Sequence, residues 1–179
     1  IHALKDRGHM KSGDNVLVLG GAGGIGISAI ELAKAFGAHV VATTSTKNIP
    51  LVKSLGADQV IDYRPQEFDH VVHGMDIVFD TIGGEVQEKS WASLKEGGIL
   101  VSVVSPPAAE KAAAHSARGA FVFIQPDAAV LTELAALVDA GKIRPIIAAE
   151  FALEDIVKAH ALSESGRADG KIVLHIGKP

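Results

Sequence analysis

A glycine-rich turn between an apolar run and an amphipathic segment constrains this 179-residue chain more than any other feature. Residues 15–19 form a short apolar run, which suits a strand buried on both faces. Residues 21–26 follow and match the pattern GxGxxG. From 24 to 36, apolar residues recur at helical spacing, and Gly37 supplies the stop. A glycine turn in this position is typical of a βαβ unit that binds a dinucleotide.

Each glycine of the turn has its own physical reason. Gly21 permits the tight turn, Gly23 lets the backbone approach a diphosphate, and Gly26 lets the helix pack closely on the strand. The first amides of the helix and the positive end of its dipole then face the anion. The alternative is a glycine turn without a ligand. The predicted diphosphate-binding residues are Gly21, Gly23, Gly24, Ile25 and Gly26.

Three other glycine motifs fit less well. A Walker loop requires lysine after its last glycine, whereas Gly26 is followed by Ile27. Short-chain dehydrogenases carry TGxxxGxG with a YxxxK motif, but Leu19 replaces the threonine and Glu67 stands four residues after Tyr63. A kinase loop joins two strands and is accompanied by an HRD motif, which this chain lacks. The dinucleotide interpretation is therefore favoured.

Strands and helices alternate along most of the chain, which predicts a doubly wound parallel α/β sheet of the Rossmann type. The segment 106–118 is interpreted as a loop or a weak helix. The expected strands are 39–43, 59–61, 76–79, 98–102, 119–124 and 171–176, and the expected helices are 50–55, 85–94, 128–140 and 154–164.

Composition excludes several classes of function. A net charge of −4 without a basic block disfavours nucleic acid as a partner. No apolar run is long enough for a membrane span, and no signal peptide is visible. The absence of cysteine rules out disulfides and Cys-type zinc sites and fits a cytoplasmic location. His70 and His73 have helical spacing, but we expect a solvated helix end there and no metal.

The end of the second expected strand indicates which dinucleotide binds. NAD-specific sites place an acidic residue about 20 residues past the glycines to bind the ribose 2′-hydroxyl. Here Thr44, Ser45 and Lys47 occupy that region, and no acid occurs before Asp58. Hydroxyls and a lysine attract a 2′-phosphate, so NADP(H) is predicted over NAD(H). The alternative is that Thr44 and Ser45 cap the next helix and that Lys47 is a solvated surface charge.

Several short segments occur along the chain in a characteristic order. They are 13–18 and 21–26, then Lys53-Ser-Leu-Gly-Ala-Asp58, Val60-Ile-Asp-Tyr63, Asp80-Thr-Ile-Gly-Gly84, Gly97-Gly98 and Gly170-Lys-Ile-Val-Leu174. With these segments the chain resembles quinone oxidoreductase-like members of the medium-chain dehydrogenase/reductase superfamily over nearly its whole length. The order and spacing of the segments are more specific than the glycine turn alone.

The resemblance implies an NADPH-dependent enzyme that reduces quinones or enones. It implies a GroES-like catalytic domain ahead of this chain, so the chain is expected to be a fragment that is inactive alone. Residues 1–144 would form the Rossmann domain, and 145–179 would return toward the catalytic domain. Without that domain, 146–147 and 172–176 should pack on each other, join the sheet or be disordered. The strand near 119–124 would pair with its copy in a homodimer.

The resemblance also implies site residues. Ser45, Lys47 and Tyr63 would surround the 2′-phosphate. Phe123 would lie near the nicotinamide, and no catalytic residue is assigned. Alternative roles are that Tyr63 covers the sheet edge, Asp80 caps a turn and Phe123 belongs to the core. Alternative functions are a fragment of a zinc-dependent alcohol dehydrogenase and a non-catalytic dinucleotide-binding or assembly module. The residues expected to line the path to the nicotinamide ribose are Asp80, Thr81, Ile82, Val103 and Val104.

Overall fold

The computed structural model describes residues 1–123, 126–166 and 168–177, and its largest element is a six-stranded parallel sheet. The strand order is β3-β2-β1-β4-β5-β6, so the direction of winding reverses between β1 and β4. This arrangement confirms the predicted doubly wound sheet. The strands are β1 (Asn15–Leu19), β2 (His39–Thr44), β3 (Gln59–Asp62), β4 (Met75–Asp80), β5 (Leu94–Ser102) and β6 (Arg118–Phe121).

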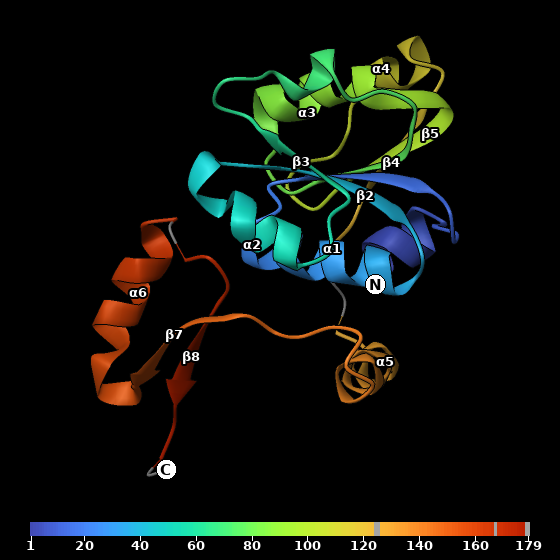
Figure 1. The fold of residues 1–179 in the computed structure, drawn as a ribbon. Helices are drawn as coiled ribbons and strands as arrows, with labels where there is room; N and C mark the ends of the chain where they lie inside the picture. Colours follow the sequence, from blue (N-terminus) through green and yellow to red (C-terminus); the bar gives the residue numbers. More distant parts are fainter. Residues whose placement is uncertain (124–125, 167, 178–179) are drawn as a thin grey trace.

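Helices cover both faces of this sheet. In Figure 1, α1 and α2 lie on one side and α3 and α4 on the other. Short helical turns at 2–7, 46–48, 68–70, 91–93 and 153–155 complete the connections. The helices are α1 (Gly24–Ala35), α2 (Ile49–Ser54), α3 (Gly84–Ser90), α4 (Ala109–Ala114), α5 (Ala128–Asp139) and α6 (Ile156–Glu164).

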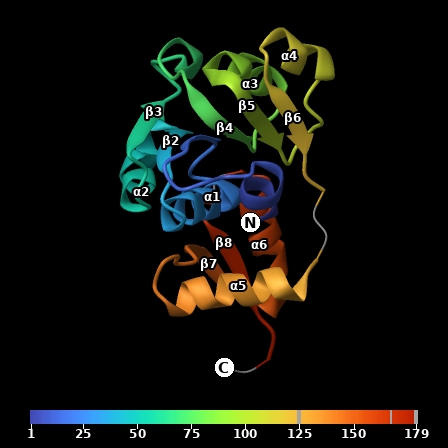
Figure 2. The ribbon, with the colours of Figure 1, turned by 90° about the vertical axis from the view of Figure 1, so that its right-hand side faces the viewer.

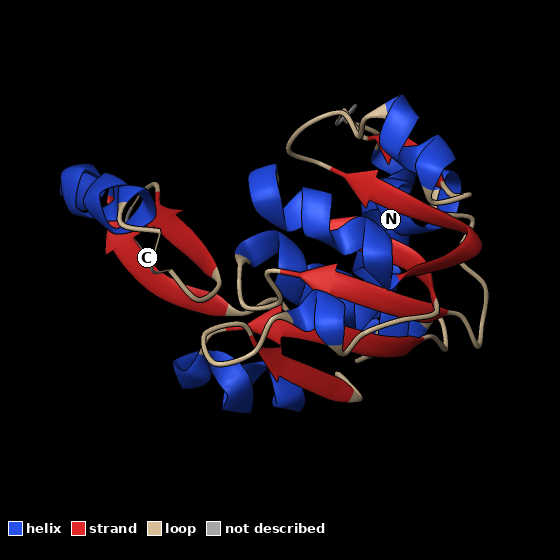
Figure 3. Ribbon diagram, turned by 90° about the horizontal axis from the view of Figure 1, so that it is seen from above, coloured by secondary structure: helices blue, strands red, loops and turns tan. Residues whose placement is uncertain are grey.

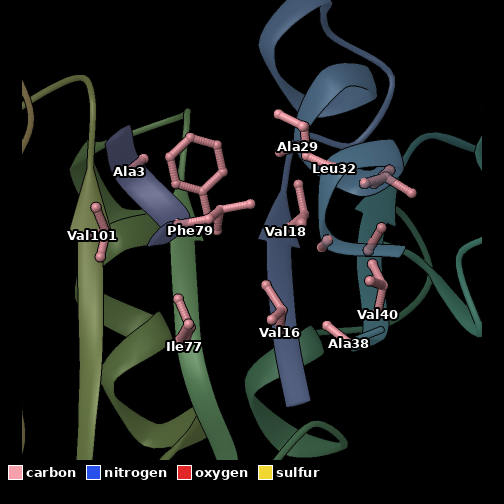
Figure 4. Close-up of a cluster of buried hydrophobic side chains, with 14 of the residues drawn as sticks. Ala3, Val16, Val18, Ala29, Leu32, Ala38, Val40, Ile77, Phe79 and Val101 are labelled. Carbon is pink, nitrogen blue, oxygen red and sulfur yellow. The ribbon is translucent and has the colours of Figure 1, made fainter. Parts of the chain in front are cut away.

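Alternation along each strand builds two cores, one on each face. Val16 and Val18 of β1 belong to the core that α1 covers, and Figure 4 shows them with side chains of β2, β4 and β5. Leu17 and Leu19 point to the opposite face and pack in the cluster that contains Trp91. Because both faces are buried, β1 is apolar from Val16 to Leu19, as the sequence pattern predicted.

Several expected elements have other bounds in the structure: the helix expected over 85–94 ends at Ser90, and the strand expected over 98–102 begins at Leu94. The strand expected over 119–124 spans only Arg118–Phe121, and Ile124 lies outside the described residues. The segment 106–118 contains the short helix α4, which agrees with the weak-helix interpretation and whose alanine residues supply good helix propensity.

A small unit at the end of the chain stands beside the main sheet. Strands β7 (Ile147–Ala152) and β8 (Lys171–His175) pair in parallel, and α6 connects them. Figure 2 shows this unit on the α1 side, and Figure 3 shows it, beside the C-terminal label, apart from the six-stranded sheet. The two apolar segments thus pair with each other, which is one of the predicted outcomes. Among the described residues, no helix combines the length and apolar character needed to cross a membrane.

Candidate cofactor-binding site

The glycine turn is held by hydrogen bonds from its backbone amides to Thr43 of β2. The Gly21 amide donates to the Thr43 carbonyl oxygen at 2.8 Å, and the Gly20 amide donates to Thr43 Oγ1 at 3.1 Å. A Cβ atom at Gly21 would lie 3.1 Å from Ala42 Cβ and from Ile30 Cδ1. The turn is therefore held close to the sheet, and the chain enters α1 in a defined direction.

The other two motif glycines occupy different surroundings. A Cβ atom at Gly26 would lie 2.2 Å from the Gly20 carbonyl oxygen, so glycine is needed for the helix to pack against the turn. A Cβ atom at Gly23 would meet only that same oxygen, at 3.5 Å. The space beside the Gly23 Cα atom is open, and the methyl group of an alanine at this position would fill it. This open cradle at the start of a twelve-residue helix suits a diphosphate.

The turn opens onto a cavity of about 680 Å³ at the carboxyl ends of the strands. This edge of the sheet lies at the reversal between β1 and β4, where open α/β sheets bind ligands. Many of the predicted site residues meet in this cavity. Its lining consists of Gly20, Ala22, Gly23, Thr44, Ser45, Lys47, Asn48, Tyr63, Arg64, Thr81, Ile82, Gly166, Ala168 and Asp169.

A second hollow of about 330 Å³ adjoins this cavity and has mainly apolar walls. Tyr63 and Ile82 border both spaces, and about half of each side chain is exposed. Phe68 and Val86 form part of the wall of the second hollow. A flat aromatic group could bury its faces there, while a charged group attached to it reached the first cavity.

The polar end of the cavity holds hydroxyls and a basic side chain. Thr44 and Ser45 are buried, with 3% and 7% of their surface exposed. Ser45 precedes the 3-10 turn Thr46–Asn48 but makes no side-chain capping hydrogen bond, so the capping alternative is not supported for it. Lys47 Nζ lies 3.2 Å from Asp169 Oδ2. Lys47 therefore has a partner across the cavity, but its side chain is 56% exposed, so its role in binding a phosphate stays a prediction beside the alternative of a surface charge.

Sequence reasoning missed Arg64 and Asp169. Arg64 directly follows Tyr63, so its basic character after a strand end was an available signal. Its amide donates to Asp62 Oδ1 at 3.0 Å, and Thr46 Oγ1 donates to Asp62 Oδ2 at 2.5 Å. These hydrogen bonds, that of Thr46 above all, hold the pKa of Asp62 below its usual value. Asp169 is 122 residues from Lys47, and no local pattern indicated it.

Asp80 is fully buried and faces the protein interior. Its Oδ1 accepts hydrogen bonds from the amides of Ile82 and Gly83, both at 2.9 Å. Its Oδ2 accepts from Gln87 Nε2 at 2.9 Å and from Ser102 Oγ at 2.8 Å. This geometry matches the turn-capping alternative: Asp80 orders the loop after β4, and its side chain does not line the cavity.

The residues expected near the nicotinamide lie along the same edge of the sheet. The Val103 amide donates to the Asp80 carbonyl oxygen at 3.2 Å. Val104 packs against Gly83, where an added Cβ atom would lie 2.9 Å from Val104 Cγ1. Phe123 is 80% exposed, so the alternative of a core residue is wrong. None of these three lines the 680 Å³ cavity, so their predicted contacts stay predictions.

The amino end of α1 has a basic neighbour that sequence reasoning also missed. A Cβ atom at Gly24 would lie 3.5 Å from Lys171 Nζ, at the start of β8. Ile25, in the first turn of α1, is 46% exposed. The first turn of the helix therefore meets solvent with a cation beside it, which suits an anion.

His70 and His73, the pair considered for a metal ion, have different neighbours in the structure. Donor atoms of His70, Glu67 and Asp69 lie within 4.8 Å of one another, but Glu67 already pairs with Lys89 at 2.7 Å. His73 Nδ1 lies 3.3 Å from the Ala92 carbonyl oxygen. We assign no metal to this exposed group.

Comparison with known proteins adds a family to this geometry. Residues 55–174 match the profile of a family described as zinc-binding dehydrogenase. The chain is 37% identical over 177 residues to a 2-methylene-furan-3-one reductase of Solanum lycopersicum, covering 95% of this chain and 42% of that protein. It is 34% identical over 176 residues to a chloroplastic NADPH-dependent alkenal/one oxidoreductase of Arabidopsis thaliana, covering 94% and 42%.

A solved structure agrees with these relatives. The fold matches the quinone oxidoreductase from Coxiella burnetii with a TM-score of 0.89 and 37% identity, covering 98% of this chain and 56% of that chain. The chain spans about half the length of the curated relatives it matches. The resemblance to quinone oxidoreductase-like proteins is confirmed.

Proposed function

The chain belongs to the zinc-binding dehydrogenase family, and from that membership we propose that it is the NADP(H)-binding part of a quinone or enone reductase. One observation carries the proposal: the open cradle at Gly23 leads into a cavity that ends at Ser45 and Lys47. A diphosphate at the first place and a 2′-phosphate at the second would be joined by an adenosine along the cavity wall.

The diphosphate would be held by the first turn of α1. Backbone amides from Gly24 to Gly26 lie at the positive end of the helix dipole. The absence of a side chain at Gly23 would let the phosphate oxygens approach these amides. Lys171 would add a cation at the same end of the helix. These groups bind and orient the cofactor without taking part in bond breaking.

The adenosine end would use the two adjoining spaces. The adenine ring would occupy the apolar hollow between Tyr63 and Ile82. Ser45, Lys47 and Arg64 would surround the 2′-phosphate, each with a donor suited to an anion. Bound NADPH would supply the hydride, and the protein would bind and orient the cofactor.

The nicotinamide side would follow the carboxyl ends of β4 and β5. The Thr81 hydroxyl donates to the Leu19 carbonyl oxygen at 2.7 Å, which fixes Thr81 beside the glycine turn. We propose that Thr81, Val103 and Val104 line the path to the nicotinamide ribose and that Phe123 lies near the ring. We assign no catalytic residue.

The substrate class comes from the relatives. Their names describe reductases of a methylene-furanone, of alkenals or enones, and of quinones, all of which contain an activated double bond. We propose that class here, with turnover requiring more than this chain. Since the chain contains no cysteine, it offers no thiolate to zinc, and we derive no step through that metal.

We also propose a homodimer through the outer edge of β6 and a cytoplasmic location. β6 is the last strand of the sheet, and its residue Phe121 is 37% exposed. The outer edge of a terminal strand offers unpaired backbone groups, which favours pairing with a second copy. The proposal of a reducing compartment is supported by the absence of cysteine.

Titration calorimetry with NADPH and NADH tests the cofactor proposal. Replacing Lys47 with Glu should weaken NADPH binding by about tenfold or more, because a cation beside a phosphate becomes an anion, and should change NADH binding much less. Lys53→Glu is the matched control, since Lys53 lies on α2 and does not line the cavity. Equal losses for both cofactors would contradict the proposed 2′-phosphate site.

A second measurement tests whether this chain binds NADPH without oxidising it. Adding NADPH and a simple quinone to this chain should give binding without oxidation of the cofactor, followed by absorbance at 340 nm. Rapid oxidation would show that the chain carries the whole reaction. A chain that bound no dinucleotide would instead favour an assembly module.

A further inference from the structure

A carboxylate from a distant part of the chain lies inside the pocket proposed for the 2′-phosphate. Asp169 Oδ2 is 3.2 Å from Lys47 Nζ, and Asp169 Oδ1 accepts a hydrogen bond from Asn48 Nδ2 at 2.8 Å. Asp169 lines the same cavity as Ser45 and Tyr63. The carboxylate of Asp169 therefore already pairs with Lys47, the lysine proposed to bind the 2′-phosphate.

The backbone around Asp169 fixes this position. Gly170 has φ +138°, and a Cβ atom there would lie 2.6 Å from the Ile146 carbonyl oxygen, so glycine brings the loop against the residue before β7. The Lys171 amide donates to the same oxygen at 2.8 Å. The carboxylate is thus tied to the β7–β8 unit directly behind it.

Two ligands would meet this carboxylate in opposite ways. A 2′-phosphate would compete with Asp169 for Lys47 and would be repelled by its negative charge. A ribose 2′-hydroxyl could donate to Asp169, which is the contact that an acid makes in NAD-specific sites. In those sites the acid follows the second strand, whereas here that region offers Thr44 and Ser45 instead.

We infer that Asp169 is a specificity-determining residue that reduces the preference for NADP(H) and allows the pocket to bind NAD(H) as well. The inference rests on the proposed function, since it concerns the same adenosine subsite. Lys47 and Arg64 attract the phosphate, Asp169 opposes it, and the balance of these charges sets the ratio of affinities.

The test compares Asp169→Asn with the unchanged chain by titration calorimetry, using NADPH, NADH, 2′,5′-ADP and 5′-AMP. The Kd for NADPH and for 2′,5′-ADP should fall by about tenfold, as expected for removing one charge a few ångströms from a phosphate in a partly exposed site. The Kd for NADH and 5′-AMP should stay the same or rise. The gain for NADPH should shrink as salt is raised, because screening weakens the repulsion.

Two further variants isolate the effect. Asp155→Asn is the matched control: Asp155 also pairs with a lysine, Lys158, in the same C-terminal segment, but it does not line the cavity. It should leave all four affinities unchanged. Asp169→Ser removes the charge with a smaller side chain and should reproduce the tenfold gain. Circular dichroism checks that each variant is folded.

The outcomes separate the inference from the proposed function. If the unchanged chain binds NADPH and the Asp169 variants alter the NADPH-to-NADH ratio by less than twofold, the inference is wrong and the cofactor site stands. Weaker NADPH binding in Asp169→Asn would also overturn it, because Asp169 would then serve to orient Lys47. Absence of binding of any dinucleotide, in all variants, would overturn both.

Discussion

Replacing Gly26 with alanine should destabilise the fold, whereas the same change at Gly23 should affect only cofactor binding. At Gly26 the new Cβ atom would lie 2.2 Å from the Gly20 carbonyl oxygen, and Cβ atoms essentially never come within 3.0 Å of another heavy atom. The turn and α1 must therefore separate by about 0.8 Å, which is overpacking of a close backbone contact.

The expected cost follows from that displacement. Overpacking of this kind costs about 1–3 kcal/mol, and the contact between two backbone segments gives little room for relaxation, so we expect the upper end. For a chain of this length, each kcal/mol lowers Tm by roughly 2–4 °C, so Gly26→Ala should melt about 6–12 °C below the unchanged chain. Urea unfolding followed by circular dichroism measures the same loss of free energy directly.

Gly23→Ala is the matched control. Its Cβ atom would meet only the Gly20 carbonyl oxygen at 3.5 Å, and its backbone φ of −74° suits alanine. The free energy of unfolding should stay within about 1 kcal/mol, because a small loss of capping is offset by reduced freedom of the unfolded chain. NADPH binding should weaken by about tenfold, since the methyl group fills the cradle. Gly26→Ala of unchanged stability, or a destabilised Gly23→Ala, would refute the reasoning.

Three further outcomes are expected. Asp80→Ala should lower the free energy of unfolding by about 3 kcal/mol or more, measured by urea titration, because it leaves several buried donors without an acceptor. Partial burial raises the pKa of Asp76, but hydrogen bonds from Lys95 and from the Asn15 amide outweigh this and hold it below its usual value. Asp76 therefore stabilises the fold above about pH 4. The stability difference between the unchanged chain and Asp76→Asn should disappear as pH falls through the lowered pKa; a constant difference would contradict this. Tyr63→Ala should weaken 5′-AMP and NADPH alike, by about 1–2 kcal/mol of lost ring contact in calorimetry, and unchanged affinities would remove the adenine from this hollow.

The strand pattern made the sheet predictable. β1 spans Asn15–Leu19 as expected, because a strand buried on both faces reads as a run of apolar residues, here Val16 to Leu19, and the glycine turn after it leaves few alternatives. The limits of β6 were less well predicted, since Arg118 and Gly119 have weak strand character. The helix over 109–114 was expected only as one of two interpretations, because the alanine-rich segment lacks helical periodicity.

The site was predictable only where it is local in sequence. Ser45 and Lys47 follow their strand directly, so their place at the carboxyl edge could be inferred from the order of elements. Asp80 was expected either to line the path to the nicotinamide ribose or to cap a turn, and its position after a strand does not show which; four donors turn its carboxylate inward. Asp169 reaches the cavity through the pairing of β7 with β8, a long-range contact that no spacing rule contains.

The distance along the chain between Lys47 and Asp169 also orders events during synthesis. Segments that emerge first from the ribosome can fold first, and the strands from β1 to β6 precede the β7–β8 unit. The growing polypeptide would thus present a nucleotide pocket with its lysine uncompensated until residues 166–171 have been translated. The net charge of the pocket during synthesis would therefore differ from that of the pocket in the completed chain.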